Sequence, residues 1–125
     1  MSWSLEYDSG NGILIETFSG PCTTDDLLSG SQERIKLGKE HKCKHLLIDV
    51  RECLVSLGIT MPMYNLVNQD YQKETDRHAW KIAVTTSSDS HTREIIDFYM
   101  NLTKNRGWKT KKFDNIPDAI DWLNE

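Results

Sequence analysis

The sequence predicts an α/β protein with a mainly parallel five-stranded sheet and an N-terminal antiparallel hairpin strand. Short apolar segments alternate along the chain with segments of helical periodicity, which is typical of strand–helix–strand units. A dense turn sequence separates the first two apolar segments, which indicates a hairpin. His45–Val50 is almost continuously apolar, as expected of a central strand covered on both faces. The expected order is ββαβαβαβα in a single domain, residues 1–125.

The N-terminal hairpin follows from alternation and turn chemistry. Trp3–Tyr7 alternates apolar and polar side chains, so Ser4 and Glu6 share the face opposite its apolar residues. Turn-forming residues fill positions 8–12, and Ile13–Phe18 is predicted to be the second strand. Polar residues on one strand face indicate that part of one side of the sheet is open, which suits a dimer contact.

The first helix has a clear start and a thin apolar face. Thr23 followed by Asp26 is a capping signature, because the threonine hydroxyl accepts from free backbone N–H groups. The helix is expected to run to about Lys39, and its inward residues are expected to be Leu28, Ser31 and Ile35. The third strand, His45–Val50, is expected to end near Asp49.

Three more helices and two more strands complete the order. The second helix opens at Thr60–Pro62, where a proline suits the first turn, and ends in the polar stretch 72–78. The predicted fourth and fifth strands are Trp80–Thr85 and Trp108–Phe113, and Gly107 ends the helix between them. The expected buried faces of the three helices are Met63, Leu66, Val67 and Tyr71, then Ile95, Phe98, Tyr99 and Leu102, then Ile116, Ala119, Ile120 and Leu123.

Composition narrows the classes of function. The 125 residues carry a formal net charge of −4, which argues against binding to nucleic acid. No stretch approaches the roughly 20 apolar residues of a membrane span. The start lacks a basic segment followed by an apolar one, so a cytoplasmic location is expected. The cysteines are expected to be free thiols, because their spacing fits neither a disulfide framework nor a zinc site: Cys22, Cys43 and Cys53.

The chain resembles the SpoIIAA-like group, the STAS domains related to anti-sigma-factor antagonists and to Sec14-type domains. The resemblance covers nearly the whole chain and rests on "HLLIDVRE", "KIAVTTSSDS", "LTKNRGWKTKKFDN" and "DAIDWLNE". It implies a compact α/β fold. In antagonists of this group a serine in an Asp-Ser-Ser-Gly type motif is phosphorylated after the central strand. Here "VRECLVSLGIT" follows Asp49, with only Ser56 or Thr60 nearby, so the usual phospho-serine motif is absent.

The predicted partner or ligand surface lies beyond the end of the central strand, where open α/β sheets bind ligands. Its residues come from the strand exit and the start of the second helix: Asp49, Arg51, Glu52, Ser56, Thr60, Met61, Met63 and Tyr64. Asp49 itself is interpreted as scaffolding at the strand exit rather than as a catalytic group. For the methionine and tyrosine side chains, packing against the sheet is the competing interpretation.

Hydroxyls at the start of the third helix form a candidate anion site: Ser87, Ser88 and Ser90. Ordinary helix capping is favoured there, because no glycine lets the backbone wrap a phosphate and Asp89 would repel one. A cluster of lysines around the fifth strand is interpreted as protection of a sheet edge rather than as an anionic partner's site. The four histidines are scattered, so no metal site and no cofactor are expected.

The expected function is a non-enzymatic protein-interaction or regulatory module, a homodimer that meets an unidentified protein partner. The alternative is a small apolar-ligand or lipid-binding protein, in line with the Sec14 side of the resemblance. A cavity lined by Met63, Leu66, Val67 and Tyr71 favours the alternative, and a filled core beneath that helix favours the module. A third hypothesis, an enzyme, requires Asp49 and His91 to converge in one cleft.

Overall fold

A computed structural model describes residues 3–56, 58–70 and 80–125 of the chain. The elements confirm the predicted ββαβαβαβα order, with a π-helical segment, η1, continuing the second helix. In chain order they are β1 (Trp3–Asp8), β2 (Ile13–Cys22), α1 (Thr24–His41), β3 (His45–Val55), α2 (Thr60–Asn65), η1 (Leu66–Asp70), β4 (Lys81–Thr85), α3 (Ser90–Lys104), β5 (Lys109–Phe113) and α4 (Ile116–Leu123).

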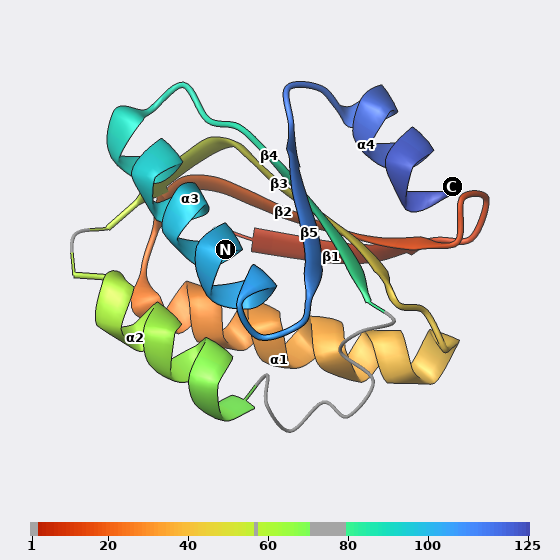
Figure 1. Cartoon of the computed structure of the whole chain (residues 1–125), viewed down its shortest axis with the longest axis horizontal. Helices are drawn as coiled ribbons and strands as arrows, with labels where there is room; N and C mark the ends of the chain where they lie inside the picture. Colours follow the sequence, from red (N-terminus) through yellow and green to blue (C-terminus); the bar gives the residue numbers. More distant parts are fainter. Residues whose placement is uncertain (1–2, 57, 71–79) are drawn as a thin grey trace.

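The five strands form one sheet in the order β1-β2-β3-β4-β5. β1 pairs with β2 in the antiparallel sense, and the remaining neighbours pair in parallel. The predicted hairpin strand therefore lies at an edge, and β3 is central as expected. Because β2 to β5 run the same way, their carboxyl ends lie at the same edge of the sheet (Figure 1).

The two faces of the sheet are covered unequally. Leu46 and Ile48 of β3 belong to the large core beneath α1, α2 and α3. Leu47 points to the opposite face, where it joins Ala83 in a small core under α4. Figure 1 shows α4 apart from the other helices, across the sheet. We call the α4 side the outer face.

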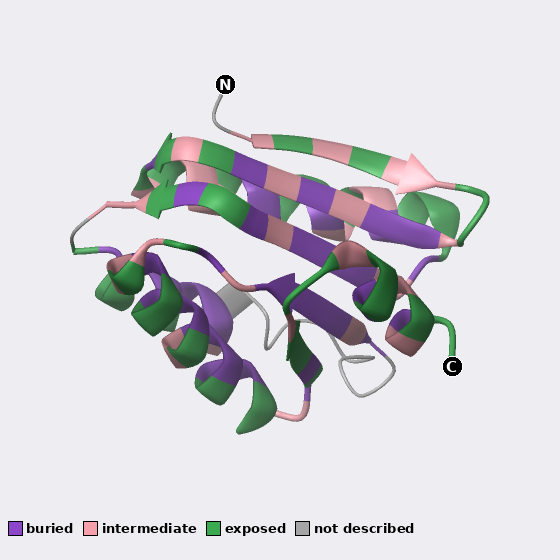
Figure 2. Cartoon of the chain, turned by 90° about the horizontal axis from the view of Figure 1, so that it is seen from above, coloured by how far each residue is buried: buried purple, intermediate pink, exposed green. Residues whose placement is uncertain are grey.

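Much of the outer face is left open, as the alternation in β1 predicted. Ser4 and Glu6 are exposed, as are Ser19 of β2 and Arg51 of β3. α4 packs mainly over β3, β4 and β5, and of β2 it covers only the start, where Ile13 joins the small core. Figure 2 shows exposed bands along the strands that α4 does not cover.

The central strand is longer than the apolar run indicated. The expectation that it leaves the core at Asp49 is wrong, because β3 continues to Val55. Thr17 of β2 pairs with Asp49, but Ser19 pairs with Glu52, so one extra residue bulges out of β3. The bulge breaks the in–out alternation, which is why the sequence pattern hid the second half of the strand.

Helix α1 lies close to the sheet because small residues face inward. Its buried residues are Gly30, Ser31, Arg34 and Gly38, whereas the predicted inward residues Leu28 and Ile35 are only half-buried. A Cβ atom added at Gly38 would stand 2.8 Å from the Trp80 ring. The predicted start of the helix is confirmed, since Thr23 and Asp26 form both hydrogen bonds of a capping box.

The other helices bury the faces that periodicity predicted. Met63, Leu66 and Val67 are buried in α2 and η1, while Tyr71 and residues 72–78 lie outside the described residues. In α3 the predicted residues Ile95, Tyr99 and Leu102 are buried and Phe98 is half-buried. In α4, Ala119 and Leu123 are buried and Ile116 and Ile120 are half-buried.

Candidate functional site

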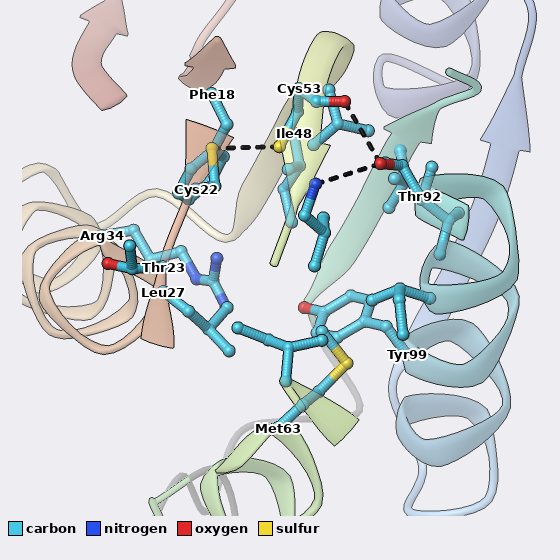
Figure 3. Close-up of a pocket in the computed structure, with 16 residues that line it drawn as sticks. Phe18, Cys22, Thr23, Leu27, Arg34, Ile48, Cys53, Met63, Thr92 and Tyr99 are labelled. Atoms are coloured by element: carbon cyan, nitrogen blue, oxygen red, sulfur yellow. Dashed lines mark hydrogen bonds between the residues drawn. The ribbon is translucent and has the colours of Figure 1, made fainter. Parts of the chain in front are cut away.

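A cavity of about 80 Å³ lies between the sheet and helices α1, α2 and α3, at the carboxyl ends of β2, β3 and β4. Figure 3 shows side chains from these strands and helices gathered around the cavity. Thr23 is exposed and Leu27 and Val55 are half-buried, so the cavity reaches the surface beside the start of α1. Nearly all of its surface is apolar, and the lining residues are Phe18, Cys22, Thr23, Leu27, Arg34, Ile48, Val50, Cys53, Val55, Ile59, Met63, Val84, Thr92, Ile95, Ile96 and Tyr99.

A buried ion pair stands beside the cavity. Arg34 of α1 donates from Nη1 to Oε1 of Glu16 in β2 over 2.6 Å, and both side chains are almost fully excluded from solvent. Burial opposes the charged form of Arg34, but the charge and hydrogen bond of Glu16, together with nearby Tyr99, outweigh it and raise the pKa of the guanidinium. For Tyr99, whose side chain also lines the cavity, burial raises the pKa. Arg34 is thus held ionised beside an apolar space.

Thr92 of α3 lines the cavity and is hydrogen-bonded to the end of β3. Its hydroxyl accepts from the backbone N–H of Val55 over 3.1 Å, and its single proton faces two acceptors, Asp89 Oδ2 at 2.8 Å and the Cys53 carbonyl oxygen at 3.2 Å. The same residue is held by Asp89, whose carboxylate accepts from the Thr92 backbone N–H over 2.9 Å. Figure 3 shows the two Thr92 bonds crossing to β3. The start of α3 is therefore fixed relative to the strand that forms the opposite wall.

Asp49, Arg51 and Glu52 lie on the outer face, away from the cavity. Both carboxylate oxygens of Asp49 are engaged: Oδ1 accepts from Arg51 Nε at 3.0 Å and Thr85 Oγ1 at 3.3 Å, and Oδ2 accepts from Arg51 Nη2 at 3.0 Å. Burial opposes ionisation of Asp49, but these bonds and the charge of Arg51 lower its pKa. Glu52 is exposed beside them. This arrangement supports the interpretation of Asp49 as scaffolding.

The remaining residues of the predicted surface, which lie in or just before α2, differ in their exposure to solvent. Met63 is buried and lines the cavity, whereas Met61 and Tyr64 are 63% and 41% exposed. Thr60 is exposed at the start of α2, and Ser56 is half-buried where its backbone N–H donates to the Cys22 carbonyl. The structure therefore separates the predicted residues, because those of β3 face the outer side of the sheet while α2 packs against the opposite side.

The three serines predicted as an anion site do not converge. Ser87 is buried, and its hydroxyl donates to the Cys53 carbonyl over 3.5 Å and accepts from the Asp89 backbone N–H over 3.2 Å. Ser88 and Ser90 are exposed. The carboxylate of Asp89 caps α3, which places a negative charge where an anion would bind. The geometry is that of an ordinary helix start.

The sequence interpretation missed the charged and sulfur-bearing part of the cavity wall. Leu14, Glu16 and Phe18 are buried at alternate positions of β2. This alternation in the sequence could have predicted that the Glu16 side chain faces inward. Arg34 lies four residues from both Gly30 and Gly38, so helical spacing also placed it inward. No local pattern indicated which partner each group would meet.

Clustered metal-ligand side chains and long apolar helices are both absent among the residues described. Within residues 3–56, 58–70 and 80–125, no three His, Cys, Asp or Glu side chains gather closely enough to hold a metal ion. In the same ranges no helix is long and apolar enough to cross a bilayer. His41 stacks on Tyr7 at 4.0 Å between ring centroids, and His78 lies outside the described residues.

Comparison with solved structures identifies the fold. An uncharacterized protein of the DUF3478 family with a SpoIIAA-like fold, from Shewanella loihica, matches with a TM-score of 0.59 and 17% sequence identity. The match covers 97% of this chain and 91% of that protein. No family model matches the sequence, and no curated protein matches it. The mixed five-stranded sheet and this likeness together show that the chain has the SpoIIAA-like fold.

Proposed function

We propose that the protein is a non-enzymatic binding domain whose cavity receives a compact apolar molecule, or one apolar end of a larger one. The observation that carries the proposal is the apolar cavity at the carboxyl ends of the parallel strands. Ligands of open α/β sheets bind at that edge, and apolar cavities stay dry enough to accept apolar guests. Met63 contributes to the lining as the carrier hypothesis expected, while Leu66 and Val67 pack in the core.

The size of the cavity limits the ligand. An engineered cavity of about 150 Å³ lined by aliphatic and aromatic residues binds benzene or xenon. The present volume of about 80 Å³ is smaller, so it suits a xenon atom or a short aliphatic or small aromatic group. A longer ligand would insert one end past Thr23 and leave its remainder outside.

Xenon and benzene are suitable probes, followed by methyl NMR. Both are expected to shift the methyl signals of Met63 and Ile95, which line the cavity, and to leave Ile13 in the small outer core unchanged. Val55→Phe should abolish the shifts, because Val55 is half-buried in the wall and a phenyl ring would fill the space. Ile15→Phe is the matched control: Ile15 is also half-buried but packs against the outer core.

Shifts of equal size at Met63 and Ile13 would contradict a specific cavity site. Unchanged Met63 and Ile95 signals at saturating xenon would overturn the proposal, because xenon requires little more than space and an apolar surface. Native mass spectrometry of protein purified without refolding then identifies any retained molecule.

A second candidate, the protein-interaction or regulatory module, draws on the outer face. Leu54 is 51% exposed there and pairs in register with Pro21, which is also exposed, so an apolar spot interrupts the polar surface. We propose a second copy of the chain as the occupant. Light scattering over a concentration series should show a dimer that Leu54→Lys weakens and Met61→Lys, at another exposed apolar position, leaves unchanged. A monomer at every concentration would contradict this candidate.

A further inference from the structure

Two thiols meet at the cavity wall. The Sγ atoms of Cys22 and Cys53 lie 3.0 Å apart, and both side chains are buried. Figure 3 shows the two sulfurs facing each other across the gap between β2 and β3. A disulfide bond measures about 2.05 Å, so the sulfurs need to approach by only about 1 Å. Cys43, the third cysteine, is buried elsewhere, with its thiol directed at the carbonyl oxygens of Gly12 and His45.

The backbone around the pair can accommodate that approach. The two strands are already hydrogen-bonded in register here, with Gly20 opposite Cys53 and Cys22 opposite Val55. Cys22 is the last residue of β2, and two positions before it Gly20, with a φ of 66°, has the conformational freedom that the absence of a Cβ atom gives. A bond between the sulfurs would therefore draw together two strand ends that are already neighbours.

We propose that Cys22 and Cys53 are a reversible redox pair that forms a cross-strand disulfide at the wall of the cavity. The oxidant is a small hydroperoxide, for which hydrogen peroxide is the probe. One thiol loses its proton and the thiolate attacks a peroxide oxygen; the O–O bond breaks, leaving a sulfenic acid, and the departing hydroxide takes up that proton to become water. The other thiol sulfur attacks that sulfenic sulfur, forming the S–S bond and releasing a second water. Two thiols and one peroxide thus become one disulfide and two waters, and a dithiol reductant reverses the reaction.

Burial decides which oxidants can react. The exposed fractions are 5% for Cys22 and 2% for Cys53, so a bulky disulfide such as oxidised glutathione cannot reach either sulfur. Hydrogen peroxide is small enough to enter through the cavity beside Thr23. Burial also raises the pKa of both thiols, which keeps them mostly protonated and slows their attack on peroxide.

The disulfide would alter the cavity from within. Both residues belong to the lining, so the bond would replace two thiols by a fixed bridge in the wall. If the cavity binds apolar ligands as proposed above, reduced and oxidised protein should differ in the xenon-induced shift at Met63. This consequence rests on the proposed function, whereas formation of the disulfide does not.

Peptide mapping tests the pair directly in the wild-type chain. Tryptic cleavage places Cys22 in residues 1–34, Cys43 in 43–44 and Cys53 in 52–73, so each possible linkage gives a distinct peptide. After hydrogen peroxide treatment and alkylation, peptide 1–34 should be linked to 52–73, with the loss of two hydrogens, while Cys43 remains an alkylated thiol. Dithiothreitol should release the link, and oxidised glutathione at the same concentration should not form it.

Variants provide the controls. Cys43→Ala should leave the linkage intact, whereas Cys22→Ala should leave Cys53 unlinked. The proposal is overturned if peroxide leaves all three wild-type cysteines as thiols, oxidises one to a sulfinic acid without linkage, or links Cys43 instead. Because the linked peptide is detected in the wild-type protein, poor folding of a variant cannot affect this result. If peroxide links Cys22 to Cys53 but xenon shifts no methyl signal, only the cavity proposal is contradicted.

Discussion

The buried pair of Glu16 and Arg34 gives the sharpest prediction about stability. At 2.6 Å and an effective dielectric constant of about 20, the attraction between the charges is about 6 kcal/mol, and loss of hydration on burial offsets much of it. Removing one partner keeps the burial cost of the other without the attraction. Either Glu16→Leu or Arg34→Met should therefore lower the free energy of unfolding by about 3–5 kcal/mol. Domains of this kind have about 5–15 kcal/mol in total.

The double variant separates pairing from packing. With both charges replaced by apolar side chains, no buried ion is left, so its stability should return to within about 1–2 kcal/mol of wild type. Urea unfolding followed by tryptophan fluorescence measures all four proteins. The control is Asp97→Asn, which breaks the exposed Lys112–Asp97 pair, 3.0 Å long, and should cost at most about 1 kcal/mol.

Two results would refute this reasoning about the ion pair. One is a single-variant cost no larger than that of Asp97→Asn, which would mean that water reaches the pair. The other is a double variant as unstable as the sum of the two singles, which would mean that the side chains act independently.

Two further predictions concern helices α1 and α3. Gly38→Ala should lower the free energy of unfolding by about 1–2 kcal/mol, because the new methyl group would lie 2.8 Å from Trp80, and overpacking exceeds the helix preference of alanine. Ser29→Ala, at an exposed position of α1, should be neutral or slightly stabilising in the same urea assay, and equal effects would contradict the close packing. Hydrogen bonds from Thr92 lower the pKa of Asp89, so this carboxylate stabilises the fold fully above its ordinary value of 3.8 and loses that effect as pH falls through the lower folded value. Asp89→Asn still caps α3 and should flatten the loss of stability below pH 3.8, and identical acid profiles would contradict the assignment.

Local rules predicted the fold well. The capping residues of α1 and the proline near the start of α4 act within one helical turn, so neighbouring residues are sufficient to define them. The alternation in β1 likewise predicted which side would be exposed. The end of β3 was mispredicted because a bulge puts Arg51 and Glu52 out of phase, and only pairing with β2 shows that the strand continues.

The predicted ligand surface and the cavity both lie at the carboxyl edge of the sheet, because parallel strands place their ends together, but they are made largely of different residues. Of the residues predicted there, Met63 lines the cavity, while Asp49 and Arg51 bind each other on the outer face. An acid following an apolar run looks the same in sequence whether it faces a cavity or the opposite side of the sheet.

By itself, the sequence determined which segments become strands and helices, where most helices begin, and which sides of them face inward, since these depend on spacings of a few residues. The tertiary structure decided which buried groups meet. Glu16 finds Arg34 18 positions away, and Cys22 finds Cys53 31 positions away. The cavity beside them is the volume left where three helices and three strand ends pack imperfectly. That volume belongs to no segment, because it depends on how side chains remote in the chain fill a shared space.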